Sequence, residues 1–325
     1  MQRIASFFRF PRYSAFPLLL LAMGGGLSGC EASNPGDSRV GGSAGEGRPA
    51  VVATSTIIAD WAEQIGGDQI ELTSILQPGA DPHVYEPVPA DSVAFEQADL
   101  ILYNGYNLEP GLIRLLTAAG ANAQHLAVGE VVPPLQLGKE GQSVPDPHVW
   151  GDVSNAVPMV EAIRDALIEL DPAQADTFTA NAAAYIEDLN QLHDWIGTQT
   201  ATIPPNQRQL VTTHDAFQYY ANAYGLTVAG TLIGISTEEQ PSAQTVQQLV
   251  RVIQNLGVPA IFAETTVNPQ LITTVAQEAG VTLAEQELYA DSIGAPGSEG
   301  DSYLNMMVAN TRAIAENLGG TVTAR

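Results

Sequence analysis

The chain has 325 residues, enough for two domains that each bury a core of ordinary size. Its formal net charge of −24 argues against nucleic acid and against electrostatic binding to anionic lipid, because both need clustered Lys and Arg. Cys30 is the only cysteine. Internal disulfides, thiolate metal sites and cysteine nucleophiles are therefore excluded, and the fold must depend on its hydrophobic core.

The N-terminus has the composition of an export signal. Arg3, Arg9 and Arg12 precede an apolar segment at 15–27 that is too short and too rich in glycine to span a membrane. Small residues then lead to Cys30, which resembles the bacterial lipoprotein signal, in which this cysteine is lipidated after cleavage. We predict a signal peptide at 1–29 and a lipid anchor on Cys30. The alternative is an ordinary signal peptide with a chance cysteine.

A polar segment rich in Gly and Ser follows the signal, and the pattern then changes to that of a folded domain. Residues 30–49 lack an apolar period and are predicted to form a flexible tether. The β-branched run at 50–58 predicts a buried strand, followed by a helix from Asp60 and a strand at 69–76. A helix at 91–99, a strand at 100–105 and a helix at 111–120 continue the alternation. This order indicates an N-terminal α/β lobe over residues 50–170.

One long helix is predicted between the two halves of the chain. Phe178, Ala182, Tyr185, Leu189, Leu192 and Ile196 fall at spacings of three and four residues. Asp171 and Pro172 supply an N-cap and a first-turn proline, and Pro204-Pro205 end the pattern. The predicted helix, residues 171–203, is about 45 Å long at 1.5 Å per residue, so it can run the length of a domain.

The alternation of strands and helices resumes after this helix. Strands are predicted at 209–217, where the strand runs into a loop, and at 259–265, with helices at 216–225, 242–257, 269–280 and 301–320. The chain is thus predicted to be an α/β protein. It has two lobes, 50–170 and 204–325, with mainly parallel sheets flanked by helices, and one long helix joins them.

Two histidines share one sequence frame. Asp-Pro-His-Val occurs at 81–84 and again at 146–149, and the chain has only five histidines. Proline fixes one backbone angle and the aspartate can bond nearby backbone groups, so both loops constrain the direction of their histidine. His83 and His148 are therefore candidate metal ligands, although a loop histidine is more often only a hydrogen-bonded polar residue.

The second half offers two more candidates. His214 lies at a predicted strand end, and Asp291 follows an apolar run. A polar strand end and a helix cap or turn are the alternative roles. His125 and His193 have no comparable frame, and we predict that they are structural.

These motifs resemble those of the solute-binding lipoproteins of bacterial ABC importers for zinc and manganese. The resemblance covers nearly all of residues 50–325, most specifically at 81–87, 146–150, 214–226, 261–264 and 291–311. It implies a binding protein, not an enzyme, with two α/β lobes, one long connecting helix and a metal between the lobes. It implies four ligands in this chain: His83, His148, His214 and Asp291. It also implies an ABC permease as partner and an extracytoplasmic location; we expect a monomer.

Three imidazoles and one carboxylate suit a divalent first-row metal ion, the transported ligand, better than Ca²⁺ or Mg²⁺. Many manganese-type members have glutamate where this chain has His214, which favours Zn²⁺. Many zinc-type members carry a histidine-rich loop that this chain lacks, so Mn²⁺ is a close second and iron a weaker third. Glu264 is the candidate that orients a ligand from outside the coordination shell, with a surface or capping role as the alternative. Asp81 and Asp146 are predicted to shape their loops.

Two other functions are compatible with the same residues. An exported zinc-dependent hydrolase would need an open coordination position and a base, and the chain has no His-Glu-x-x-His signature. A surface adhesin of the same family would need a host partner, which no sequence feature specifies. A metal titration distinguishes a carrier from an adhesin, and a hydrolysis assay with zinc restored tests for an enzyme.

Overall fold

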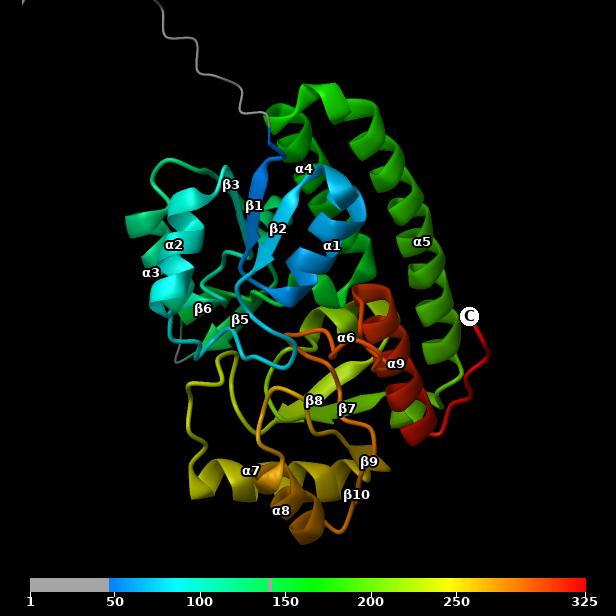
Figure 1. Ribbon diagram of the computed structural model, residues 1–325. Helices are drawn as coiled ribbons and strands as arrows, with labels where there is room; N and C mark the ends of the chain where they lie inside the picture. Colours follow the sequence, from blue (N-terminus) through cyan, green and yellow to red (C-terminus); the bar gives the residue numbers. More distant parts are fainter. Residues whose placement is uncertain (1–46, 140–141) are drawn as a thin grey trace, which may run out of the picture. The chain divides into compact units, whose positions relative to one another are not determined.

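The computed structural model describes residues 47–139 and 142–325, which belong to one compact unit (Figure 1). The predicted signal peptide, the predicted lipid anchor on Cys30 and most of the predicted tether lie outside the described residues. Among the residues that are described, no helix combines the length and the apolar character needed to cross a membrane.

The first lobe is built on a parallel sheet of four strands in the order β2-β1-β3-β4. Its strands are β1 Ala50–Ala53, β2 Glu71–Ser74, β3 Leu100–Tyr103 and β4 Gln124–Ala127. Its helices are α1 Thr56–Gly66, α2 Pro89–Gln97 and α3 Pro110–Ala119. An antiparallel hairpin, β5 Gln136–Lys139 and β6 Gln142–Pro145, follows the sheet.

Successive residues of the central strand β1 face two different cores, as the period of a strand requires. Val51 and Ala53 belong to the large core that also holds residues of α1. Val52 belongs to a second core with Phe95 of α2 and Leu112 of α3. Because helices cover both faces, the strand is apolar without alternation, which is typical of a parallel sheet.

The sequence placed the end of the first strand too late. The run at 50–58 was expected to be a single strand, but β1 ends at Ala53 and α1 begins at Thr56. The Ser55 hydroxyl accepts a hydrogen bond from the Ile58 N–H and so caps α1. The capping bond therefore outweighs the β propensity of Thr56, Ile57 and Ile58.

The second lobe repeats the strand order of the first. β7 Gln209–Thr212 pairs in parallel with β8 Thr227–Thr231, and β9 Ala260–Ile261 pairs in parallel with β10 Thr282–Leu283. The Phe262 N–H donates to the Val211 carbonyl (3.0 Å), which brings the two pairs together as β8-β7-β9-β10. The helices of this lobe are α6 Gln218–Tyr224, α7 Ala243–Leu256, α8 Gln270–Ala279 and α9 Tyr303–Asn317.

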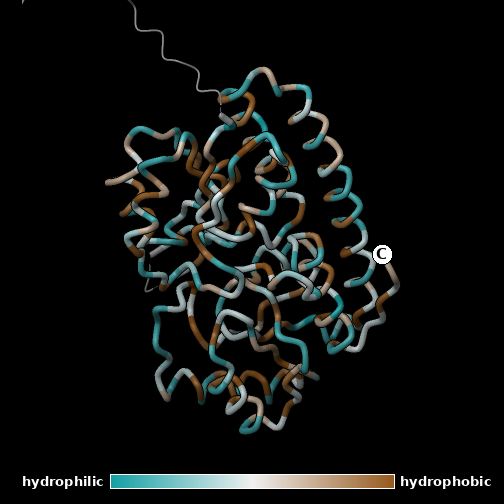
Figure 2. The backbone as a smooth tube through the Cα atoms, viewed as in Figure 1, coloured by the Kyte–Doolittle hydropathy of each residue, from teal (hydrophilic) through white to brown (hydrophobic). Residues whose placement is uncertain are grey.

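The long connecting helix is α5, Ala175–Ala201, and it packs along α4, Val153–Leu170 (Figure 1). The predicted apolar stripe from Phe178 to Ile196 is buried, and Figure 2 shows hydrophobic and hydrophilic residues alternating along α5. The predicted fold class, two α/β lobes with mainly parallel sheets and one long connecting helix, is confirmed.

The start of the connecting helix differs from the prediction. Asp171 does not cap the long helix; its carboxylate accepts from the Ala173 N–H and caps a separate 3₁₀ turn, Pro172–Gln174. The chain turns there from α4 into α5, so the aspartate and the proline mark a corner between two helices. Helix α4 was not predicted.

Asp60 of α1 joins three elements at a buried point. Its Oδ2 accepts hydrogen bonds from the Tyr303 N–H at the start of α9 (3.0 Å) and from the Tyr185 hydroxyl of α5 (3.3 Å). The neighbouring Trp61 packs edge-on against Tyr303 with ring centroids 5.0 Å apart. Burial raises the pKa of the Asp60 carboxyl above its ordinary value. This junction ties the first lobe, the connecting helix and the second lobe together.

Candidate metal centre

Four buried side chains, two from each lobe, converge on one point. His83, His148, His214 and Asp291 each offer a donor atom, and these atoms all lie within 4.8 Å of one another. The Nε2 atoms of His148 and His214 lie 3.4 and 3.3 Å from the Asp291 carboxylate, and the Nε2 atoms of His83 and His148 lie 3.3 Å apart. None of the four residues is more than 3% exposed.

The strand order explains why these residues meet. His83 follows β2, His214 follows β7 by two residues, and Asp291 follows Leu288, which forms a parallel bridge to Glu264. His148 follows the hairpin strand β6. In open α/β sheets, the crevice outside the carboxyl ends of the strands is where ligands bind. Both lobes present such an end to the same point.

The repeated Asp-Pro-His frame gives a repeated turn. The Asp81 Oδ1 accepts from the His83 N–H (2.9 Å), and the Asp146 Oδ1 accepts from the His148 N–H (3.0 Å). Each aspartate therefore closes a short loop over its proline by a bond to the backbone two residues later. This matches the loop-shaping role predicted for both aspartates.

Two of the three imidazoles are also held by a carboxylate on the ring nitrogen that faces away from the centre. Asp146 Oδ1 lies 2.7 Å from His148 Nδ1. Glu264 accepts from the His214 N–H (2.9 Å) and contacts His214 Nδ1 through its other oxygen. In the neutral form of each ring, with its one proton on Nδ1, the Nε2 lone pair points to the centre, as a metal ligand requires. Glu264 thus lies where the sequence suggested an orienting residue.

The contact of Asp146 with the His148 ring was missed by the sequence analysis. The Asp-x-His spacing indicates a loop bond, and the same spacing also brings the carboxylate within reach of the ring. Asp81 has the same spacing, but the structure gives it a different second partner: its Oδ2 accepts from the Thr237 hydroxyl of the second lobe at 2.6 Å. The sequence signal therefore identifies both aspartates without distinguishing their roles.

The centre holds donor atoms that no protein group satisfies. Both oxygens of Asp291 and Nε2 of His214 are buried without a hydrogen-bond partner among the described residues. A buried acceptor without a partner is costly unless a ligand satisfies it. Three imidazole nitrogens and one carboxylate form a donor set that fits a divalent transition metal ion.

The protonation states of the centre follow from burial and charge. Burial, the largest influence, lowers the pKa of His83 to about 3. Burial alone would raise the pKa of Asp291, but His214, His148 and His83 together hold it well below its ordinary value. Burial alone would lower the pKa of His214, but Glu264 and Asp291 raise it well above that of a free histidine. The carboxylate of Asp291 is thus ionised and His83 is neutral at neutral pH.

The other two histidines lie apart from this centre. His125 Nε2 lies 2.7 Å from the Gly120 carbonyl, and His193 Nδ1 lies 3.1 Å from the Tyr224 hydroxyl. Both contacts are local supports between neighbouring elements, in keeping with the structural role predicted for them.

Comparison with known proteins identifies the family of this chain. Residues 51–317 match the family described as zinc-uptake complex component A, periplasmic (ZnuA). The chain belongs to this family. Over 292 residues it is 38% identical to the manganese-binding lipoprotein MntA of Halalkalibacterium halodurans, covering 90% of this chain and 94% of that protein. It is 36% identical over 299 residues to the metal ABC transporter substrate-binding lipoprotein FimA of Streptococcus parasanguinis, covering 90% and 95%.

A solved structure of a relative has the same fold. The periplasmic zinc binding protein TroA from Treponema pallidum superposes with a TM-score of 0.80 at 32% identity, covering 84% of this chain and 99% of that chain. The ZnuA family comprises solute-binding proteins of ABC transporters, so family membership argues for a binding protein and against an enzyme.

Proposed function

We propose that this protein is an extracytoplasmic, lipid-anchored solute-binding protein that captures a divalent transition metal ion and delivers it to an ABC permease. The metal would be held by His83, His148, His214 and Asp291, with Glu264 orienting His214. Lipid on Cys30 would hold the protein at the membrane, and it would act as a monomer. We also propose that the two lobes comprise residues 50–170 and 204–325, and that residues 171–203 connect them.

The single observation that carries the proposal is the convergence of four buried donor residues, in which both Asp291 oxygens and His214 Nε2 have no hydrogen-bond partner among the described residues. Bonds of about 2 Å in a tetrahedral shell put neighbouring donors roughly 3.3 Å apart. Three of the measured separations are 3.3 to 3.4 Å, and the His83–Asp291 separation is 4.0 Å. All four donor atoms lie within 4.8 Å of one another, so shifts of about 1 to 2 Å would bring them to such a shell.

The number of ligands supports a carrier over a hydrolase. A catalytic zinc ion usually has three protein ligands and an open position for water, whereas four protein ligands fill a tetrahedral shell. FimA is described as a metal ABC transporter substrate-binding lipoprotein and MntA as a manganese-binding lipoprotein, and these descriptions favour neither the hydrolase nor the adhesin.

We propose that Zn²⁺ binds more tightly than Mn²⁺ at equilibrium. Three nitrogen donors favour Zn²⁺, and the intrinsic order of affinities places Mn²⁺ below Zn²⁺ for such a site. Mn²⁺ is a close second as the cargo in the cell, because both oxygens of Asp291 face the centre and allow a fifth bond. Among the relatives, MntA is named as a manganese-binding protein and TroA as a zinc binding protein.

The test is an equilibrium titration of chelator-treated protein with Zn²⁺ and Mn²⁺, each in competition with a chelator of known affinity. We expect one ion per chain. The His83→Ala variant should lose affinity by about a hundredfold or more, since even partners outside the coordination shell contribute 10- to 100-fold. The matched control is His125→Ala, which removes a histidine far from the centre.

Two results would contradict the proposal. One is the absence of ion binding by the wild-type protein, and the other is a His83→Ala variant that binds one ion as tightly as His125→Ala does. If neither result is found, elemental analysis of protein purified from its native compartment without chelator would identify the physiological cargo.

A further inference from the structure

A cavity of about 490 Å³ reaches the candidate metal centre from the surface. Its walls include His83 but none of the other three donors. On the first lobe the cavity is bounded by Tyr106, Asn107 and Glu130, and on the second lobe by Ile235 and Ser236. His83 is therefore the donor that lies between the centre and this cavity.

The wall on the first lobe is formed by a left-handed turn and an acidic residue that bonds to it. Gly105, Tyr106 and Asn107 have φ values of 84°, 49° and 59°, a left-handed run that is unusual for residues with side chains. The Glu130 Oε1 accepts from the Tyr106 N–H (3.0 Å) and so supports this turn. The carboxylate of Glu130 is exposed and lines the cavity, so a cation that enters meets a negative charge.

His83 is held differently from the other two histidines. His148 and His214 each have a carboxylate on Nδ1, whereas Asp81 bonds the backbone N–H of His83. The second oxygen of Asp81 accepts from Thr237, which is one residue beyond the cavity wall at Ser236. The His83 loop is thus fastened to the second lobe by this hydrogen bond and, four residues before His83, by the Gly79 N–H, which donates to the Ser292 hydroxyl (2.8 Å). Among the described residues, its ring lacks the carboxylate support on Nδ1 that the other two rings have.

We propose that metal ions enter and leave through this cavity, that Glu130 attracts them, and that the Asp81–Thr237 hydrogen bond latches the His83 loop over the bound ion. This inference rests on the proposed function of the centre. Opening requires that the part of the loop next to His83 separate from Thr237, while the Gly79–Ser292 hydrogen bond can hold the start of the loop in place. The carboxylate supports of His148 and His214 stay in place while the ion passes His83.

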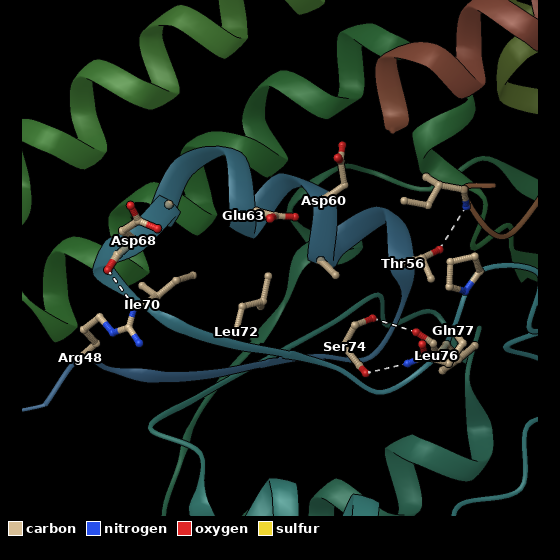
Figure 3. Close-up of a pocket in the computed structure, with 14 residues that line it drawn as sticks. Arg48, Thr56, Asp60, Glu63, Asp68, Ile70, Leu72, Ser74, Leu76 and Gln77 are labelled. Atoms are coloured by element: carbon tan, nitrogen blue, oxygen red, sulfur yellow. Dashed lines mark hydrogen bonds between the residues drawn. The ribbon is translucent and has the colours of Figure 1, made fainter. Parts of the chain in front are cut away.

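A second cavity of the protein supplies the control. A cavity of about 400 Å³ lies between α1 and β2, and its lining includes Glu63 but none of the four donors (Figure 3). Glu63→Gln and Glu130→Gln remove the same single charge from the same lobe. Only the second change removes it from the cavity that reaches His83, and glutamine can still accept the Tyr106 N–H.

Association is measured by rapid mixing of metal-free protein with Zn²⁺, with tryptophan fluorescence as the signal, because the Trp150 ring lies 5.4 Å from the His148 ring. Dissociation is measured by mixing loaded protein with excess chelator. Glu130→Gln should slow association and dissociation together by roughly tenfold, since a carboxylate on the route attracts a divalent cation by about that factor. Glu63→Gln should have the same rates as the wild type. A Glu130→Gln variant with the same rates as Glu63→Gln would overturn the proposal that metal ions pass through this cavity.

The latch is tested by Thr237→Val, which keeps the side-chain shape and removes the hydroxyl. Dissociation should become about tenfold faster, the usual contribution of a hydrogen bond to a carboxylate. Thr198→Val, at an exposed position on α5, is the matched control. Equal dissociation rates in the two variants would refute the latch. Failure of the wild-type protein to bind Zn²⁺ at all would overturn the proposed function and this inference with it.

Discussion

Replacing Glu109 by glutamine probes a buried carboxyl group that supports the His148 loop from behind. Glu109 Oε1 accepts from the Asn104 N–H (2.7 Å) and from the Thr54 hydroxyl (2.9 Å), while Oε2 is buried without a partner. The Asn104 side-chain amide in turn donates to the Pro147 carbonyl, next to His148 (3.0 Å). Burial outweighs the two hydrogen bonds and raises the pKa of Glu109 to about 7.

The direction of the pH effect follows from this raised pKa. The folded protein holds the proton up to about pH 7, whereas the unfolded chain releases it near pH 4.5. Stability from this group is therefore complete below pH 4.5 and is lost as the pH rises through 7. Between pH 5 and pH 8 the loss is about 2 to 3 kcal/mol, at 1.36 kcal/mol per unit of pKa difference.

The assay is urea unfolding of metal-free wild-type and Glu109→Gln protein at pH 5 and at pH 8. Glutamine cannot ionise, so the variant should gain about 2 to 3 kcal/mol relative to the wild type between the two pH values. Glu169→Gln, an exposed position on α4, controls for the loss of a negative charge and should show no such gain. If Glu109→Gln and the wild type lose stability in parallel, burial does not keep this carboxyl protonated and the reasoning is refuted.

Three further predictions concern the centre and the connecting helix. Asp146→Asn and Glu264→Gln should each weaken Zn²⁺ binding by roughly 10- to 100-fold in a chelator competition, because each removes the charge behind one imidazole; unchanged affinity would contradict this. Leu189→Ala on the buried stripe of α5 should cost about 2 to 5 kcal/mol in urea unfolding, and a loss below about 1 kcal/mol would show that the helix packs loosely. Small-angle scattering should give the same radius of gyration with and without Zn²⁺, since α4, α5 and the Asp60 junction hold the lobes together; a wide closure on binding would refute it.

Periodic patterns predicted the fold well because they report burial directly. The stripe from Phe178 to Ile196 predicted α5, and the alternation of strands and helices predicted two α/β lobes. The predicted ends of helices and strands were wrong where a hydrogen bond from a side chain decides which backbone conformation forms. Ser55 starts α1 inside a run with strong β propensity, and Asp171 caps a 3₁₀ turn in place of the long helix.

The sequence was enough to predict which residues belong to the candidate site, but only some of the contacts between them. The repeated Asp-Pro-His frame made His83 and His148 candidates, and positions after apolar strand-like runs made His214 and Asp291 candidates. The family resemblance then implied all four as ligands. Their role as metal ligands stays a prediction. The hydrogen bond between Asp81 and Thr237 joins residues 156 positions apart in different lobes. No local pattern encodes such a contact, so the different tasks of Asp81 and Asp146 could be seen only in the folded protein.

The Asp60 junction has a consequence for communication with a transporter. A carrier whose two lobes are joined at a buried carboxylate cannot signal that it holds a metal ion by a large change in its overall shape. A permease that rejects empty carriers would have to recognise a difference of a few atoms at the mouth of the cleft. Discrimination would then depend on how closely the permease contacts that small patch, so substitutions there would affect transport without changing metal affinity.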